Sequence, residues 1–178
     1  KMLEAITKKD FIGNYDSIPV LKYESVLYGE VKKPGLGPLH TEFDGKGNAY
    51  TSFFVSSEIV KWNIKDLTVL DRAPTYYSIG HLCIPGGDSR KPNAKYVIAY
   101  NKITKDRYLP TGPELAQSAQ LYDSTGEKMK MILDFPTVGE PHYAQAVAAD
   151  VISKNSRKFF KLEENENPFV TKGEKEAR

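Results

Sequence analysis

The feature that most constrains the fold is a series of short apolar runs separated by polar, glycine-bearing turns. Two of these turns are especially clear, DGKGN at residues 44–48 and STGEK at residues 124–128. Turns of this composition between apolar runs are typical of β-hairpins. The pattern predicts short strands at residues 26–31, 49–55, 58–63, 95–101, 119–123, 129–134, 144–149 and 157–162. Helix signals are weaker and are confined to residues 1–12 and 146–153.

Many short strands with a turn about every ten residues predict an all-β fold, which is a sandwich, a barrel or a propeller. The spacing of the histidines favours the propeller, because 81 − 40 = 41 residues separate His40 from His81. One four-stranded propeller blade takes about 40–45 residues. The next interval, 142 − 81 = 61 residues to His142, corresponds to a blade with an insertion. Residues 101–120, which are rich in proline and charge, are the expected insertion.

The composition argues against several classes of protein. The formal net charge is only +2, from 25 basic and 23 acidic residues that are scattered along the chain, so no nucleic-acid partner is expected. A single cysteine, Cys83, permits no intrachain disulfide and no CxxC metal site. No apolar run approaches the roughly 20 residues of a transmembrane helix, so no membrane partner is expected. Both ends are interpreted as cut from a longer chain, since there is no initiator methionine, signal peptide or closing element.

The three histidines are the residues with the clearest chemical potential. Imidazole is the commonest side-chain ligand for copper and zinc. His40, His81 and His142 each follow a lead-in that carries glycine or proline. Equivalent positions of successive blades converge on the central channel of a propeller, so three histidine-bearing loops at blade spacing predict a metal site made only of nitrogen ligands. The alternative is that each is an isolated structural histidine, and spacing alone leaves both interpretations open.

Longer motifs narrow the choice of family. The stretches are PLHTEFDGKGNAYT at 38–51, GHLCIPGGDSR at 80–90, NKITKDRYLPTGP at 101–113 and GEPHYAQ at 139–145. Together they resemble the nitrous oxide reductase family, in its atypical branch, over nearly the whole chain. The resemblance implies an N-terminal seven-bladed β-propeller followed by a C-terminal cupredoxin domain. Residues 1–162 would then cover roughly the last two to three blades, and residues 163–178 would be a linker toward the cupredoxin domain, which this chain lacks.

The resemblance also implies a reaction and a set of site residues. The family reduces nitrous oxide to dinitrogen and water in denitrification, at a four-copper sulfide cluster held by seven histidines. By motif, His40, His81 and His142 match the last three of those seven. Lys102 matches a lysine beside the open edge of the cluster, where a cation would stabilise developing charge on oxygen. Glu140 matches a carboxylate that does not bind the metal itself but orients the ligand imidazoles and raises their basicity.

Further implied features concern other cofactors and partners. The family binds calcium near the 101–113 motif, which implicates Lys102 and a downstream acid; here Gln117 takes the acid's place and brings no charge. The dinuclear copper site of the cupredoxin domain is absent from this chain. The implied setting is a periplasmic homodimer that receives electrons from a c-type cytochrome or a similar donor. This chain alone is expected to be inactive.

A different class of function fits the same strand pattern. In that alternative the chain is part of a non-catalytic β-propeller binding module, and its histidines are structural. The two interpretations differ in one geometric respect. A shared metal site requires the imidazoles of His40, His81 and His142 to converge, whereas structural histidines have no reason to do so.

Overall fold

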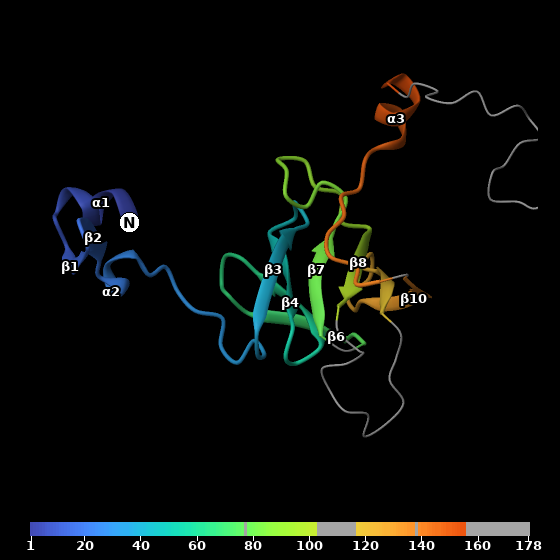
Figure 1. Cartoon of the computed structure of the whole chain (residues 1–178), viewed down its shortest axis with the longest axis horizontal. Helices are drawn as coiled ribbons and strands as arrows, with labels where there is room; N and C mark the ends of the chain where they lie inside the picture. The colour runs from blue at the N-terminus through green and yellow to red at the C-terminus, as the bar shows by residue number, and fades with distance from the viewer. Residues whose placement is uncertain (77, 103–116, 138, 156–178) are drawn as a thin grey trace, which may run out of the picture. The chain divides into compact units, whose positions relative to one another are not determined.

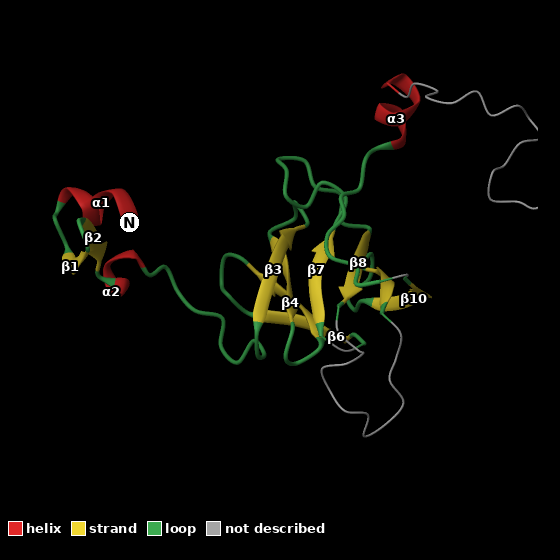
Figure 2. Ribbon diagram, in the orientation of Figure 1, coloured by secondary structure: helices red, strands yellow, loops and turns green. Residues whose placement is uncertain are grey.

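The computed structural model describes residues 1–76, 78–102, 117–137 and 139–155. The chain divides into two compact units, residues 1–146 and residues 147–178, and each is described by itself. The first unit begins with a small helical and hairpin region: α1 (Met2–Thr7), β1 (Phe11–Tyr15), β2 (Ile18–Leu21) and α2 (Tyr23–Val26) (Figure 2). The described part of the second unit contains α3 (Ala149–Asn155). Among the described residues, no helix has the length and apolar character needed to cross a membrane.

Two four-stranded antiparallel sheets make up the rest of the first unit. The first contains β3 (Pro38–Phe43), β4 (Asn48–Phe53), β5 (Glu58–Asn63) and β6 (Val69–Pro74), in the order β3-β4-β5-β6. The second contains β7 (Ile79–Cys83), β8 (Tyr96–Asn101), β9 (Ser118–Asp123) and β10 (Lys130–Pro136), in the order β10-β9-β8-β7. In each sheet every strand pairs with the next one in sequence, which is the arrangement of a propeller blade. Figure 1 shows the two first strands, β3 and β7, side by side.

One hydrophobic core joins the two sheets. The first sheet contributes Tyr50, Ile59 and Ala73, and the second contributes a larger apolar set. That set comprises Ile79, Leu82, Ile84, Ala94, Val97, Ala99, Tyr122 and Met129. Burial of this apolar surface, at about 25 cal/mol per Å², is the main force that holds one sheet on the other.

Several sequence predictions are confirmed. The turns at 44–48 and 124–128 connect β3 to β4 and β9 to β10. Five of the predicted strands correspond to β4, β5, β8, β9 and β10, and the two weak helix signals correspond to α1 and α3. The predicted insertion lies between β8 and β9, although most of it falls outside the described residues.

Other predictions were wrong. Residues 26–31 form no strand, because their apolar character is not matched by a neighbouring strand; Tyr28 instead donates its hydroxyl to the Lys65 carbonyl. Residues 144–149 are irregular up to the start of α3, and the predicted strand at 157–162 lies outside the described residues. The strands β1, β2, β3, β6 and β7 were not predicted. Two of these carry His40 and His81, which therefore lie on strands and not on loops.

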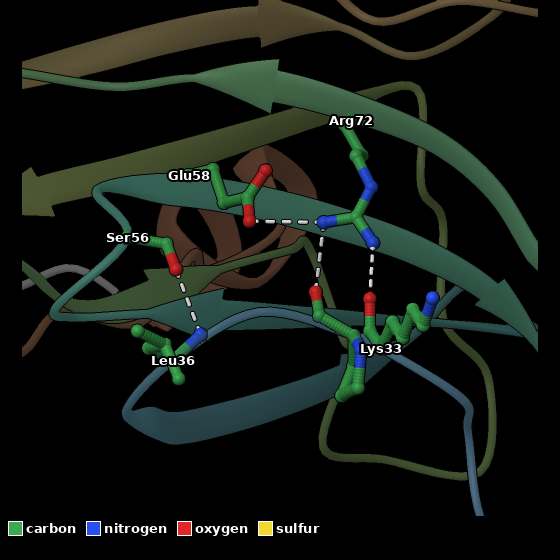
Figure 3. Close-up of polar contacts among 6 residues, drawn as sticks. Lys33, Leu36, Ser56, Glu58 and Arg72 are labelled. Carbon is green, nitrogen blue, oxygen red and sulfur yellow. Dashed lines mark hydrogen bonds and ion pairs between the residues drawn. The ribbon is translucent and has the colours of Figure 1, made fainter.

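An arginine fixes the chain where it approaches the first sheet. Arg72 on β6 donates to the carbonyl oxygens of Lys33 (2.7 Å) and Pro34 (2.8 Å) and to the Glu58 carboxylate (2.9 Å) (Figure 3). Charge-assisted bonds of this kind are stronger than neutral ones. These bonds hold the residues just before β3 against β5 and β6. They therefore fix the position at which β3, the strand that carries His40, begins.

Candidate metal centre

The first histidine lies at an irregularity of strand β3. Pro38 pairs with Phe53, whereas Thr41 pairs with Thr51, so three steps along β3 correspond to two along β4. This is a β-bulge, in which one extra residue turns a side chain away from the regular alternation of the strand. His40 lies inside the bulge, immediately before the regular pairing resumes.

Strand β7 repeats the same irregularity at the second histidine. Ile79 pairs with Asn101 and Leu82 pairs with Ala99, which is again three steps against two. His81 takes the same place in this bulge as the earlier histidine takes in β3. The two sheets therefore present a histidine at the same position of the first strand, which gives a structural basis to the repeat seen in the sequence.

The three histidine rings lie in a row. The ring centroids of His40 and His81 are 4.9 Å apart, and those of His81 and His142 are also 4.9 Å apart. The third ring comes from the irregular segment after β10, at its motif GEPHYAQ. Within the described ranges, no group of three or more His, Cys, Asp or Glu side chains is placed to hold a metal ion together. His81 thus contacts both other rings, and we call these three contacting rings the histidine row.

The protonation of the first two rings suits metal binding. Burial lowers the pKa of His40 and of His81, and for His81 the neighbouring His40, Lys102 and His142 add to the effect. Both rings are therefore neutral at neutral pH, and a neutral imidazole has a lone pair to offer.

The hydrogen bonds of these rings differ. His81 Nδ1 is buried and has no hydrogen-bond partner among the described residues, which is costly for a polar atom unless it serves as a ligand. His40 Nδ1 accepts a 3.0 Å hydrogen bond from the Leu82 amide, so its neutral ring carries the proton on Nε2. At His81 no hydrogen bond would have to break for Nδ1 to bind a metal, while at His40 a metal would have to displace either that proton or the amide.

Lys102 reaches the end of the histidine row. Its Nζ lies 3.1 Å from His142 Nδ1 and 3.7 Å from the Glu140 carboxylate. The side chain is 11% exposed and passes over the bulge of β7, where the chain has Gly80. A Cβ at Gly80 would lie 2.8 Å from Lys102 Cγ and closer still to Cδ and Cε. Only glycine leaves room for this lysine, and the structure brings both Lys102 and Glu140 to the row.

Gln117, predicted as a calcium ligand with Lys102, lies next to that residue. The Gln117 side chain donates from Nε2 to the Lys102 carbonyl oxygen over 3.1 Å. Rotation of the amide would bring its oxygen beside the same carbonyl, so two oxygen donors are available at one place. Most of the loop between them, residues 103–116, falls outside the described residues, and the calcium site stays a prediction.

Sequence reasoning missed Tyr143. Its ring meets the His81 ring edge-on at 5.2 Å between centroids and the His40 ring at 6.0 Å. Its hydroxyl accepts from Gln145, which also donates to Asp88 in the turn after β7. The available signal was that Tyr143 directly follows His142 in the motif GEPHYAQ, so it had to lie near that histidine.

Sequence reasoning also missed Glu42. This carboxyl is 3% exposed, and burial raises its pKa to about 7. Its side chain accepts from the Ile84 amide. A signal was present, because Glu42 follows His40 by two residues and alternate residues of a strand share a face.

Comparison with known proteins identifies the family. The family model for the nitrous oxide reductase propeller repeat matches residues 72–142, which include the bulge of β7 and two of the three histidines. The chain is 39% identical over 127 residues to a nitrous-oxide reductase of Stutzerimonas stutzeri, and 39% identical over 132 residues to one of Cupriavidus necator. The chain belongs to the nitrous oxide reductase family. These matches cover 66% and 68% of this chain but only 20% of each relative, so the chain spans a small part of the proteins it resembles.

Membership in the nitrous oxide reductase family agrees with the repeated geometry. Propeller repeats are four-stranded sheets of about 40 residues, and both sheets have this form. The two bulged histidines then occupy equivalent positions of two successive repeats. The names of these relatives favour this interpretation over that of a non-catalytic β-propeller binding module.

Proposed function

We propose that the full-length protein containing this chain reduces nitrous oxide to dinitrogen and water, with His40, His81 and His142 as copper ligands. The observation that carries the proposal is the row of three imidazoles at 4.9 Å intervals, two of them on equivalent bulges. The names of the relatives support the reaction. A series of imidazoles in contact with one another suits a centre with several metal ions, because each ring can serve a different ion.

The wider architecture is part of the same proposal. Seven blades would close into one propeller with the histidine row facing the central channel, and the other blades would supply four further histidines. A cupredoxin domain with a dinuclear copper site would pass electrons from a c-type cytochrome or similar donor. The protein would be a periplasmic homodimer that works in denitrification. A four-copper sulfide cluster held in part by His40, His81 and His142 would supply the redox and Lewis-acid chemistry of the reaction.

The chain's own residues have separate tasks in this proposal. Reduction of nitrous oxide consumes two protons and two electrons and leaves water, so negative charge develops on the oxygen as the N–O bond breaks. The Lys102 ammonium, which is largely removed from water and contacts His142, would stabilise that charge. Glu140, at 3.7 Å, holds the lysine in position. Calcium, held through the Lys102 carbonyl and the Gln117 amide oxygen, would stiffen the strand ends on which this lysine depends.

The proposal is tested by removing one imidazole at a time from the full-length protein. The variants H40A, H81A and H142A are each expected to lose cluster copper and its visible absorption. Lys46→Ala, in the exposed turn of the same hairpin as His40, is the control and is expected to keep both. Unchanged copper content and absorption in all three histidine variants would favour a binding module with structural histidines.

A further inference from the structure

We propose that Glu42 is a positioning residue that sets the distance between His40 and His81 by fastening β7 to β3. The inference rests on the proposed function, in which these two histidines serve one centre. It concerns how the chain holds the ligands and adds no new ligand. The side chain contacts neither imidazole by hydrogen bond; it acts through the backbone of the neighbouring strand.

The contact between β3 and β7 is made differently from the contacts within each sheet. These strands belong to separate sheets, so no backbone ladder joins them. Two side chains of β3 take the place of the ladder: His40 accepts from the Leu82 amide, and Glu42 accepts from the Ile84 amide. We call these two bonds the inner seam. The two acceptors lie two residues apart on β3, and the two donors lie two residues apart on β7 and directly after it.

The surroundings of Glu42 leave little freedom to its carboxyl. The turn after β7 folds over it, and Phe43 donates its amide to the Gly87 carbonyl at 3.0 Å. A Cβ at Gly87 would lie only 2.5 Å from Glu42 Oε2, so this turn accepts no side chain there. A carboxyl that is 3% exposed and held on two sides is a fixed attachment point.

The attachment constrains the histidine on β7. His81 directly precedes Leu82, the first donor of the inner seam, and Ile84 is the second donor. Without a metal, two bonds two residues apart prevent β7 from sliding or turning against β3. Where a metal displaces the Leu82 amide from His40, the Glu42 bond is the one of the two that remains. Loss of the Glu42 acceptor would also leave a buried amide unpaired, which is costlier than loss of an exposed bond.

The same two sheets offer a matched control at their outer strands. Asp71 on β6 is 7% exposed and accepts a 2.6 Å hydrogen bond from the Met129 amide of the second sheet. The chemistry is the same, a buried carboxyl that bonds a backbone amide of the next sheet. The position differs, because this bond lies far along the sheet from the strands that carry the histidines.

The experiment compares Glu42→Ala, Glu42→Gln and Asp71→Ala in the full-length copper-loaded protein. Amide hydrogen exchange of the peptide containing Leu82 and Ile84 reports the seam, and the visible and EPR spectra report the copper centre. We expect E42A to exchange this peptide at least tenfold faster and to shift the spectra. E42Q, which keeps an acceptor of the same length, is expected to restore both. D71A is expected to lower the melting temperature but to leave the spectra unchanged.

Two results would overturn the proposal: wild-type exchange in E42A, or spectra that change in D71A as much as in E42A. If E42A does not accumulate, Glu42→Asp decides, because a carboxyl one methylene shorter should speed exchange of the same peptide. The hydrogen exchange is also measured on metal-free protein. A wild-type protein without copper would refute the proposed function, while the exchange data would still show whether Glu42 fastens β7.

Discussion

The two sheets are copies of one plan that differ at their bulges. In both, a histidine lies in a bulge of the first strand. In the first sheet the freed His40 amide donates to the Ser52 hydroxyl at 3.1 Å. In the second, the residue before His81 is Gly80, and Lys102 passes over it. In the first bulge a serine hydroxyl binds the freed amide, and in the second a glycine leaves room for the Lys102 side chain. The two sheets thus share one backbone arrangement and differ in the side chains beside the histidine.

A second difference lies two residues beyond each histidine. The first sheet has Glu42 there, bonded to the second sheet, whereas the second sheet has Cys83. Cys83 is buried in a small apolar cluster with Tyr100 and Ala119. The equivalent position thus makes a hydrogen bond to the neighbouring sheet in the first sheet and packs against apolar side chains in the second. Of the two sheets, only the first supplies the acceptor side chains of the inner seam.

The largest expected effect follows from removing the cation of the second bulge. Lys102→Met keeps the length of the side chain and removes its charge. Under the proposed function, we expect kcat of the full-length enzyme to fall about 10²-fold while copper content is kept. Lys95→Met, at an exposed position, is the control. A kcat within twofold of wild type would show that the lysine at the end of the row is only structural.

The buried carboxyl of Glu42 should make the stability of the protein depend on pH, which an apolar side chain at that position would not do. Burial raises the pKa of Glu42 from its ordinary value of 4.5 to about 7, so the folded state binds more protons between these two pH values. The free energy of unfolding of metal-free protein should therefore fall as pH rises from about 4.5 to about 7. The full effect is on the order of 3 kcal/mol, since one pKa unit corresponds to about 1.4 kcal/mol.

The control for this pH effect is Glu42→Gln, which cannot ionise. Its stability relative to wild type should increase over the same pH range, in denaturant titrations at several pH values. Parallel curves for the two proteins would contradict the buried, protonated state of the carboxyl.

Gly80→Ala tests the second bulge directly. The added methyl group would overlap the methylenes of Lys102, and overpacking of this kind costs about 1–3 kcal/mol. We expect a loss of that size in the free energy of unfolding, measured in urea, together with displacement of the lysine. Gly126→Ala is the matched control, because its added methyl group would meet only the Lys128 carbonyl at 3.8 Å. Equal losses in both variants would mean that the close approach is unimportant.

Ser52→Ala tests the first bulge and should have the smallest effect. The His40 amide loses its hydroxyl acceptor, at a cost of about 1 kcal/mol. Ser89→Ala, in an exposed turn, serves as the reference in the same urea titrations. If Ser52→Ala is neutral, the first bulge does not depend on its polar closure, and the contrast between the two sheets becomes weaker.

Sequence reasoning reached the turns and the repeat but not the strands that carry the site. Glycine-bearing turns and apolar strands are local signals, so β4, β5 and β8 could be predicted. The strands β3 and β7 begin with proline or contain glycine and histidine, and a bulge breaks the alternation by which strands are recognised. The burial of Lys102 was not predictable either, because it depends on Gly80, which is remote in sequence and adjacent in space.

The arginine contact before β3 has a consequence for how this part of the chain tolerates change. Arg72 bonds the backbone at Lys33 and Pro34, so we expect it to limit how far a displacement of the preceding residues reaches toward His40. Insertions or deletions upstream of Lys33 should therefore disturb the histidine row less than changes after it. The chain before this contact can then vary in sequence and conformation while the positions of the histidines after it are kept.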